Sequence, residues 1–466
     1  MQQAVERPMM NLMTSLIGLG SHLAGWRHPD AWSGTVMNFG HALRIAQLAE
    51  RGKFDLLFLA DGNAVRQMDN PVLFSAPARS DRPATFEPLT LLAALSQHTR
   101  HVGLFATATT TYDEPYLLAR RFASLDHLSG GRACWNVVTG SYAGDSVNFG
   151  RVTHVPREER YERAREFIQV CKGLWDSWAE DAFPEDKASG RFLDPAKVQR
   201  LDHVGKHFSV QGPLNVARPV QGYPLIFTAG QSEPGRELAA EFAEGLFSVV
   251  TEKADSIAFC ADVKSRMAKY GRTPDQLRIL PACTMYVGRS EAEADDLYGE
   301  LQELITPELG VEYLSRICQF DLRGLPLDGP LPEISGEVDG AVSYRDATVA
   351  MAKRENLSIR QTYQRVVPTL GHMAFKGDPV QIADQMEDWY RSGACDGFNL
   401  DMPVQPRSLE TFVELVVPEL QRRGIFRTEY PGGTLRDTMG LKRPERVVRR
   451  SAGGGLPSGD PLTHSA

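Results

Sequence analysis

Polar side chains follow several short apolar runs of this 466-residue sequence, at the point where each run ends. Asp61 follows FDLLFLA, Thr107 lies in VGLFATATTTY, and Asn136 lies in GRACWNVVTG. Carboxylate, hydroxyl and amide groups supply the hydrogen-bond donors and acceptors that the edge of a flat heterocyclic ring requires. No pair of carboxylates at the strand ends stands out as acid and base for hydrolysis. The pattern therefore indicates ligand binding.

A fourth run, PLIFTAG, ends in a turn that contains Gly230, Gln231 and Ser232, and Gly235 opens the helix that follows. A hydroxyl group, glycine backbone and a helix N-terminus together form a site suited to a phosphate. Each residue alone also has a structural explanation, because Ser and Thr cap helices and Asp ends strands. Four such strand ends in one chain favour the binding interpretation.

The elements that position these residues are short apolar runs alternating with longer amphipathic segments. Most of the runs are apolar without alternation, as expected for parallel strands covered on both faces. The predicted strands are Met9–Leu19, Phe54–Ala60, Val102–Ala108, Ala133–Val138, Leu225–Ala229, Leu246–Val250, Leu277–Val287 and Gly397–Met402.

Amphipathic stripes with steps of three and four predict helices between the strands. Eight strand–helix units are typical of a closed (β/α)₈ TIM barrel, whose active site lies where the strands end. A doubly wound open sheet would need G-x-G-x-x-G after its first strand, and Gly18–His22 does not supply it. The predicted helices lie near residues 36–46, 88–98, 115–128, 161–178, 234–243, 254–270, 378–391 and 409–423.

The predicted barrel spans residues 1–441. It contains three long insertions that a minimal barrel does not need, near 63–85, 179–208 and 321–368. The last is Gly/Pro-rich with a possible helix near 346–355, and its length makes it a candidate lid over the site. Residues 442–466 form a Gly/Pro/Ser-rich segment that carries a basic run. Such a segment is typical of a solvated, disordered tail.

Composition excludes several classes of partner. The formal net charge of -8 argues against nucleic acid and anionic membrane surfaces. No apolar run reaches the roughly 18 residues that a membrane span needs. Six cysteines without a C-x-x-C pair, and no His or carboxylate spacing typical of a metal site, predict free thiols, no metal, and a cytoplasmic location.

The sequence resembles the bacterial-luciferase-like flavin-dependent monooxygenases, and in particular the nitrilotriacetate monooxygenase and dibenzothiophene-sulfone monooxygenase group. The matching motifs occur in order through most of residues 25–441. They are GWRHPDAW (25–32), FDLLFLADG (54–62), EPYLLARRFASLDHLSGGRACWNVVTG (114–140), NFG (148–150), RYERAREF (160–167), LWDSW (174–178), DHVGKHFSVQGPLNVARPVQGYPLIFTAGQSEPG (202–235) and TLRDTMGL (434–441).

The resemblance implies a (β/α)₈ barrel that receives reduced FMN from a separate NAD(P)H:flavin reductase. Such an enzyme inserts one oxygen atom of O₂ into a small organic substrate, and the family suggests a homodimer or homotetramer. Two alternatives stay open. One is an F420-dependent oxidoreductase that transfers hydride on the same fold, and the other is a flavin-binding protein without turnover.

By the same resemblance, Asp61, Thr107, Asn136, Tyr161 and the turn with Gln231 and Ser232 contact the flavin. A further family position, usually His, is Arg157 here, with His154 three residues earlier. Arg157 could serve the cofactor, His154 could replace it, or the contact is lost. No catalytic residue is assigned, and His22 is the candidate for a residue on the substrate side.

The substrate is less well defined, because the relatives attack aminopolycarboxylates, aryl sulfones and antibiotic precursors. A polyanionic substrate would require several arginines or lysines in the pocket. Only Arg27, Arg66 and Arg157 are placed in the sequence to serve that purpose. We therefore expect a neutral or hydrophobic substrate.

Overall fold

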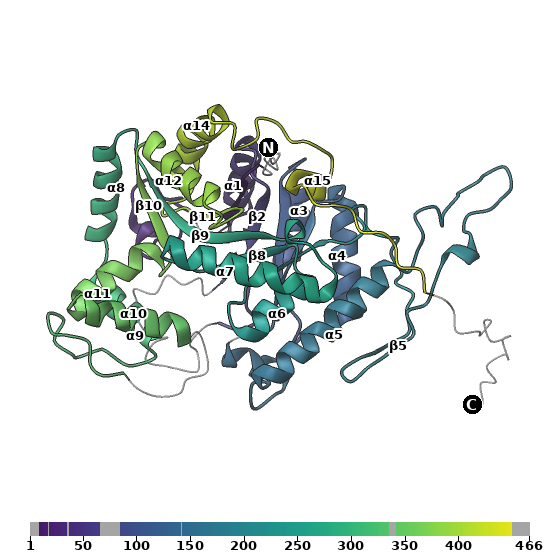
Figure 1. The fold of residues 1–466 in the computed structure, drawn as a ribbon, viewed down its shortest axis with the longest axis horizontal. Coiled ribbons are helices and arrows are strands. Elements are labelled where there is room, and N and C mark those ends of the chain that lie inside the picture. Colours follow the sequence, from purple (N-terminus) through teal and green to yellow (C-terminus); the bar gives the residue numbers. More distant parts are fainter. Residues whose placement is uncertain are drawn as a thin grey trace, which may run out of the picture.

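Eight parallel strands form a closed ring in the computed structural model, which describes residues 9–16, 18–34, 37–65, 84–140, 142–334 and 342–449. The ring closes because β11 pairs with β1. Every strand predicted from the sequence is present, and the (β/α)₈ barrel is confirmed (Figure 1). In ring order the strands are β1 (Asn11–Ser15), β2 (Leu56–Leu59), β3 (Gly103–Thr109), β4 (Ala133–Val138), β7 (Leu225–Thr228), β8 (Gly245–Ser248), β9 (Arg278–Val287) and β11 (Gly397–Asp401).

A ninth strand, β10 (Met373–Gly377), has no counterpart among the predicted strands. It pairs with residues 283–287 of β9, beyond residues 278–281, which pair with β8. The backbone N–H of Met373 also donates to the carbonyl of Val250, so β10 continues where β8 ends. Its side chains alternate between buried and exposed, so this short run lacks the continuous apolar character by which the other strands were predicted.

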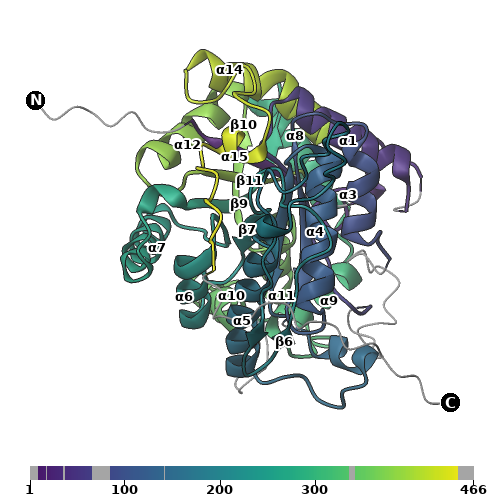
Figure 2. The ribbon, with the colours of Figure 1, turned by 90° about the vertical axis from the view of Figure 1, so that its right-hand side faces the viewer.

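Helices surround the ring on its outer face (Figures 1 and 2). Proline at the first helical position and side-chain caps such as Asp378 fix several of their starts. The predicted helices are all present, as α1 (Phe39–Arg51), α3 (Pro88–Ser96), α4 (Pro115–Ser129), α5 (Arg157–Trp175), α6 (Glu233–Phe242), α7 (Lys253–Arg266), α12 (Pro379–Arg391), α13 (Arg407–Thr411) and α14 (Val417–Arg422), the last two joined by a π-helical stretch at 412–416.

The interior of the ring is apolar at the N-terminal end of the strands. Met13, Leu56, Phe105 and Phe227 pack there against one another. The helix α15 (Leu435–Met439), from the TLRDTMGL motif, inserts two of its side chains into this cluster and closes that end of the barrel. The open end of the barrel is therefore the one where the strands finish.

The stretch 321–368 is more ordered than the sequence indicated. Its described part contains α10 (Val342–Arg354) and α11 (Ile359–Val366), which pack with α9 (Pro307–Cys318) around a separate apolar cluster. α8 (Glu291–Glu303) precedes this helical layer. The cluster includes Ala24, which follows β1, so the layer lies beside the open end of the barrel. Residues 335–341 of the predicted insertion, and residues 66–83 of the first one, lie outside the described residues.

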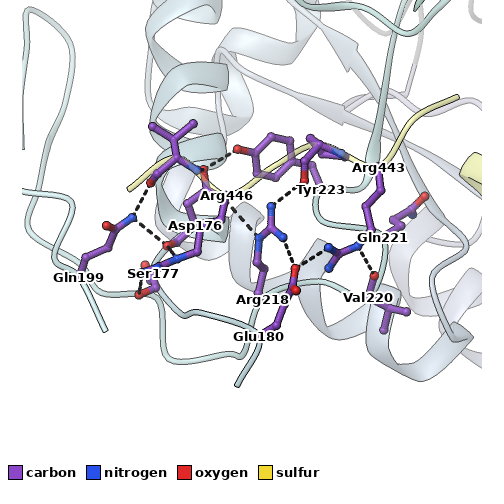
Figure 3. Close-up of polar contacts among 12 residues, drawn as sticks. Asp176, Ser177, Glu180, Gln199, Arg218, Val220, Gln221, Tyr223, Arg443 and Arg446 are labelled. Carbon is purple, nitrogen blue, oxygen red and sulfur yellow. Dashed lines mark hydrogen bonds and ion pairs between the residues drawn. The ribbon is translucent and has the colours of Figure 1, made fainter. Parts of the chain in front are cut away.

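The basic run after residue 441 differs from the solvated tail that was expected. Residues 442–449 run along the C-terminal end of α5 and the 179–208 insertion, which carries the hairpin of β5 (His203–Val204) with β6 (Ser209–Val210) (Figures 1 and 3). Arg446 donates to the backbone carbonyl of Asp176 at 3.0 Å, and Arg443 forms an ion pair with Glu180. Complementary charge on the insertion thus orders this part of the tail, and residues 450–466 lie outside the described residues.

Asp176 is the centre of this contact. Its buried carboxylate accepts from the Tyr223 hydroxyl at 2.5 Å, from Arg218 at 3.3 Å and from the backbone N–H of Val447 at 3.1 Å (Figure 3). A buried carboxylate without such donors would be costly. The network therefore joins α5, the end of the insertion and the tail into one unit.

We predict that Arg436→Ala destabilises the protein by about 3–5 kcal/mol, because its buried guanidinium binds Glu244 and the carbonyls of Gln221 and Tyr223. Urea unfolding measures the loss. Arg443→Ala is the control, since its side chain is 41% exposed and an exposed ion pair contributes about 1 kcal/mol or less. Equal losses in both variants would contradict a closing role for α15.

Candidate active site

The ends of β2, β3, β4 and β7 open into a cavity of about 480 Å³. Four of the seven residues predicted to bind the cofactor line it, namely Asp61, Thr107, Asn136 and Tyr161. Gly230 and Gly235 of the predicted phosphate turn also line it. Because parallel strands of a barrel all end on the same face, residues far apart in the chain meet in this one cavity.

Asn136 and Thr107 lie opposite each other on β4 and β3 and form the floor of the cavity. The Asn136 amide donates to the Thr107 hydroxyl at 2.9 Å. Asn136 Oδ1 is buried and has no hydrogen-bond partner among the described residues. An orphaned buried acceptor is rare in folded proteins. It fits a ligand that presents an N–H group at this point.

Asp61 follows β2 and is half-buried at the cavity wall. Burial raises the pKa of its carboxyl group to about 6, the N–H of Gly62 opposes this rise, and the nearby charges of Glu87 and Asp145 add to it. The group is therefore ionised only in part near pH 6. It can act either as an acceptor or as a donor toward a ligand.

The turn between β7 and α6 is closed so tightly that a side chain would not fit. A Cβ atom on Gly230 would come within 3.0 Å of Gly235 Cα, and one on Gly235 within 2.9 Å of the Gly230 carbonyl carbon. Ser232 occupies the N-cap of α6, but its side chain makes no capping hydrogen bond. Its hydroxyl lies 3.4 Å from the Tyr161 hydroxyl instead. Capping alone does not explain this serine.

Gln231 has a different position from its neighbours in the turn. Its side-chain oxygen accepts from the backbone N–H of Val249 at 3.2 Å, and its backbone carbonyl accepts from Arg236 at 2.8 Å. Neither Gln231 nor Ser232 is among the residues that line the cavity, whereas Gly230 and Gly235 are. The contacts of Gln231 connect the turn to the end of β8 and hold the turn in place.

Arg157 and His154 were the two candidates for the position that is usually His in the family. The structure places His154 nearer the cavity. Its ring nitrogens lie 2.6 Å from the Tyr112 hydroxyl and 3.2 Å from the carbonyl of Gly140, which lines the cavity. Arg157 is exposed at the start of α5 and does not line the cavity. Arg160 contacts both His154 and Gly140, a role that its place in the RYERAREF motif did not reveal.

His22, the candidate for the substrate side, does not line the cavity. It is 2% exposed, and its Nδ1 accepts from the backbone N–H of Ala24 at 3.1 Å. Burial lowers the pKa of its imidazole to about 3. The ring is therefore neutral at physiological pH and acts here as a local backbone acceptor.

Carboxylates dominate the charged lining of the cavity. Glu87, Asp113 and Asp145 join Asp61, and Arg121, which pairs with Asp113 at 3.6 Å, is the guanidinium group that lines it among the described residues. Sequence reasoning missed these three acidic residues because none of them lies in a recognised motif, and Asp145 lies in a short 3-10 helix at 143–149. Of the predicted cationic residues, Arg27 donates to the Leu304 carbonyl. Arg66 lies outside the described residues.

The described part of the chain contains no group of three or more His, Cys, Asp or Glu residues arranged to hold a metal ion. Its helices include none that is long and apolar enough to cross a membrane. None of the six cysteines, all of which lie in the described part of the chain, forms a disulfide, and all six are buried.

We predict that Asp61→Asn stabilises the protein above about pH 6, because ionisation of the half-buried carboxylate costs folding free energy there. The folded-state pKa of about 6 exceeds the ordinary value of 3.8, so this cost fades as the pH falls through 6 and is absent below 3.8. After allowance for solvent screening, we expect a gain of about 1–2 kcal/mol near pH 8 and none near pH 4. Urea unfolding at both pH values measures it. Exposed Asp296→Asn is the control, and a gain independent of pH would contradict the prediction.

Comparison with known proteins agrees with this geometry. A family model described as luciferase-like monooxygenase matches residues 13–396. The chain is 48% identical to nitrilotriacetate monooxygenase component A of Aminobacter aminovorans over 92% of this chain and 96% of the relative. It is 45% identical to N-acetyl-S-(2-succino)cysteine monooxygenase of Bacillus subtilis (strain 168), over 94% and 98%.

Solved structures separate the two enzyme classes that the resemblance left open. EDTA monooxygenase from Chelativorans sp. BNC1 is 33% identical, with a TM-score of 0.75 over 94% of this chain and 99% of that chain. An F420-dependent tetrahydromethanopterin reductase from Methanopyrus kandleri is 14% identical, with a TM-score of 0.54 over 88% and 99%, and shares the fold alone. The higher identity to the monooxygenases thus favours oxygenation over F420-dependent hydride transfer. The chain belongs to the luciferase-like monooxygenase family and is a flavin-dependent monooxygenase.

Proposed function

We propose that this protein is the oxygenase component of a two-component system. In it, reduced FMN comes from a separate NAD(P)H:flavin reductase, and one atom of O₂ is inserted into a small organic substrate. The observation that supports the choice of FMN is the turn at Gly230 and Gly235, which lines the cavity beside the Ser232 and Tyr161 hydroxyls at the N-terminus of α6. Bound reduced flavin would supply the reaction with O₂, while the protein orients it and excludes water.

Different residues in and beside the cavity would bind the phosphate and the ring system of FMN. The Ser232 and Tyr161 hydroxyls, with the N-terminus of α6, would hold the phosphate. Asn136 Oδ1 would accept a hydrogen bond from the ring system, and Thr107 holds the Asn136 amide in the required orientation. Asp61 would face the pyrimidine edge of the ring. His154 takes the place that we first considered for Arg157.

The partner proteins and the location follow from the same proposal. The Aminobacter relative is named as component A, which supports a system of more than one protein. We propose a homodimer or homotetramer, as the family suggests. Free thiols at all six cysteines suit the cytoplasm, where NAD(P)H is available to a reductase.

We propose a neutral or hydrophobic substrate, because carboxylates outnumber cations among the described cavity residues. Three relatives are named for polyanions, namely nitrilotriacetate, N-acetyl-S-(2-succino)cysteine and EDTA. A panel of these compounds and neutral dibenzothiophene sulfone, assayed with a flavin reductase, NADH and ¹⁸O₂, tests the proposal. We expect ¹⁸O in the product of a neutral compound. Turnover of the polyanions alone would show that the inferred substrate charge is wrong.

Ser232→Ala should weaken the binding of reduced FMN by about 1–3 kcal/mol, the cost of losing a hydrogen bond to a charged phosphate. Anaerobic titration with reduced FMN measures the change. The matched control is Ser290→Ala, which removes the N-cap of α8, where the side chain does accept a hydrogen bond from the helix.

The two serine variants should have opposite effects on fold stability and flavin affinity. Ser290→Ala should lower the stability of the fold by about 1 kcal/mol and leave flavin affinity unchanged. Ser232→Ala should spare the fold, because its side chain caps nothing. An unchanged affinity for reduced FMN in Ser232→Ala would show that the phosphate does not bind at this turn.

A further inference from the structure

A second set of polar residues lies across the open end of the barrel from the cavity. It comprises Thr284 on β9, Asn399 and Asp401 on β11, and His372 just before β10. None of them lines the cavity described above. Thr284 and Asp401 are partners in the parallel register of their two strands, so their backbones are adjacent.

The alternation of side chains along each strand points this set into the barrel. Phe398 and Leu400 pack outward in the large core between strands and helices, so Asn399 and Asp401 face the interior. On β9, Leu280 belongs to the interior cluster, and Thr284 lies on the same face four residues later. Asn399, Asp401 and Thr284 are each buried, with 3% exposure or less.

Hydrogen bonds connect these residues in a line that ends at His372. The Ser15 hydroxyl donates to Asn399 Oδ1 at 3.2 Å, and the Asn399 amide lies 3.4 Å from Asp401 Oδ1. Asp401 Oδ2 lies 3.1 Å from His372 Nδ1. A buried carboxylate at Nδ1 fixes the orientation and the tautomer of an imidazole and leaves Nε2 as the nitrogen able to accept a proton.

His372 is placed so that Nε2 can meet a ligand in the open end of the barrel. Its side chain keeps 16% exposure, although Asp401 beside it keeps only 3%. The ring packs edge-on against Phe247, at 6.2 Å, and Phe247 contacts the interior cluster. No protein partner of Nε2 occurs among the described residues. The nitrogen that a proton acceptor would use therefore has no protein partner in the described part of the chain, and it belongs to a side chain that keeps some exposure.

Thr284 gives an independent indication that a ligand belongs here. Its hydroxyl is fully buried and has no hydrogen-bond partner among the described residues. Burying an unpaired hydroxyl costs free energy. A polar group of a substrate held beside Asp401 and His372 would satisfy it.

The order of strands in the ring sets this pair opposite the proposed flavin site. β3 and β4, which carry Thr107 and Asn136, stand four positions from β9 and β11 in the ring of eight. The mouth of an eight-stranded barrel is narrow. A flat ring bound over β3 and β4 would therefore have His372 on the opposite side of the ring of strands.

Given the proposed monooxygenase function, on which this inference rests, we propose that His372 is the catalytic proton acceptor of the substrate side and that Asp401 is its positioning residue. The substrate's X–H bond breaks, its electron pair stays on X, and the proton bonds to His372 Nε2. X then takes one oxygen atom of O₂. The second oxygen atom leaves as water, and the proton held by His372 contributes to that water. Two-electron oxidation of reduced FMN completes the balance.

A first measurement tests the pair without any flavin. Selectively labelled histidine gives NMR signals that report which ring nitrogen carries the proton. We expect the His372 proton on Nδ1 in the wild type and a shift toward Nε2 in Asp401→Leu, which keeps the volume but removes the acceptor. An unchanged tautomer in Asp401→Leu would overturn the positioning role.

A second measurement tests the placement of the residue. Diethyl pyrocarbonate acylates accessible neutral imidazoles, and mass spectrometry follows each histidine separately. We expect oxidised FMN to slow the modification of His372 in proportion to its occupancy. His203 is the matched control, because it also pairs with a carboxylate, Glu166 at 2.9 Å, but lies on the hairpin away from the barrel mouth. If bound FMN leaves His372 as reactive as before, the placement is wrong.

Kinetics with the substrate panel test the chemistry. His372→Gln should lower kcat by about 100-fold, as expected for loss of a general base, with KM and FMN affinity nearly unchanged. His203→Gln should leave all three constants at their wild-type values. Failure of the wild-type protein to bind FMN would contradict the proposed function itself. Wild-type turnover with full kcat retained in His372→Gln would overturn only the role of this histidine.

Discussion

Closure of the ring between β11 and β1 is the constraint on which the rest of the structure depends. These two strands lie at opposite ends of the chain, and their pairing forces all the barrel strands to finish on one face. Side chains that end each strand then gather without any contact between them in the sequence. The cavity over β2, β3, β4 and β7, and the polar pair beyond β9 and β11, are both products of this closure.

The interior of the ring is divided along its axis. Apolar side chains fill the N-terminal half, and α15 closes that end with two more. Buried arginines secure this closure: Arg436 binds Glu244, and Arg278 donates to the carbonyls that end α15. Polar side chains occupy the C-terminal half, where several have no hydrogen-bond partner within the described part of the chain. A barrel built this way concentrates its stability at one end and its unsatisfied polar groups at the other, which is where a ligand enters.

Buried polar atoms without a hydrogen-bond partner among the described residues mark where ligands would bind in the open half of the barrel. Asn136 Oδ1 and Thr284 Oγ1 are both buried and orphaned, yet they lie on opposite sides of the ring. One fits the edge of a flavin and the other fits a polar group of a substrate. The carboxylates around Asp61 add a local field that disfavours anions beside the ring and helps to raise the Asp61 pKa. These groups support the proposal that the site binds one large flat molecule and one smaller partner.

The sequence by itself determined the barrel and its contents. Every strand of the ring was predictable, because runs such as FDLLFLA and GRACWNVV are apolar on both faces, and this pattern depends only on local composition. The motifs around Asp61 and Asn136 pointed to residues that line one cavity, and the flavin contact predicted for Ser232 stays a prediction. Their positions at strand ends sufficed, since a parallel barrel assembles strand ends in a known way.

Only the tertiary structure decided the contacts between distant segments. It placed His154, and not Arg157, beside Gly140, and it docked the basic tail on Asp176 and Glu180. The pairing of His372 with Asp401 was equally hidden, because His372 precedes a short half-exposed strand that was not among the predicted ones. Such contacts depend on the angle at which helices and strands pack. They also depend on which charged side chains become buried and need a partner of opposite charge. Neither quantity is encoded in the periodicity of a single segment.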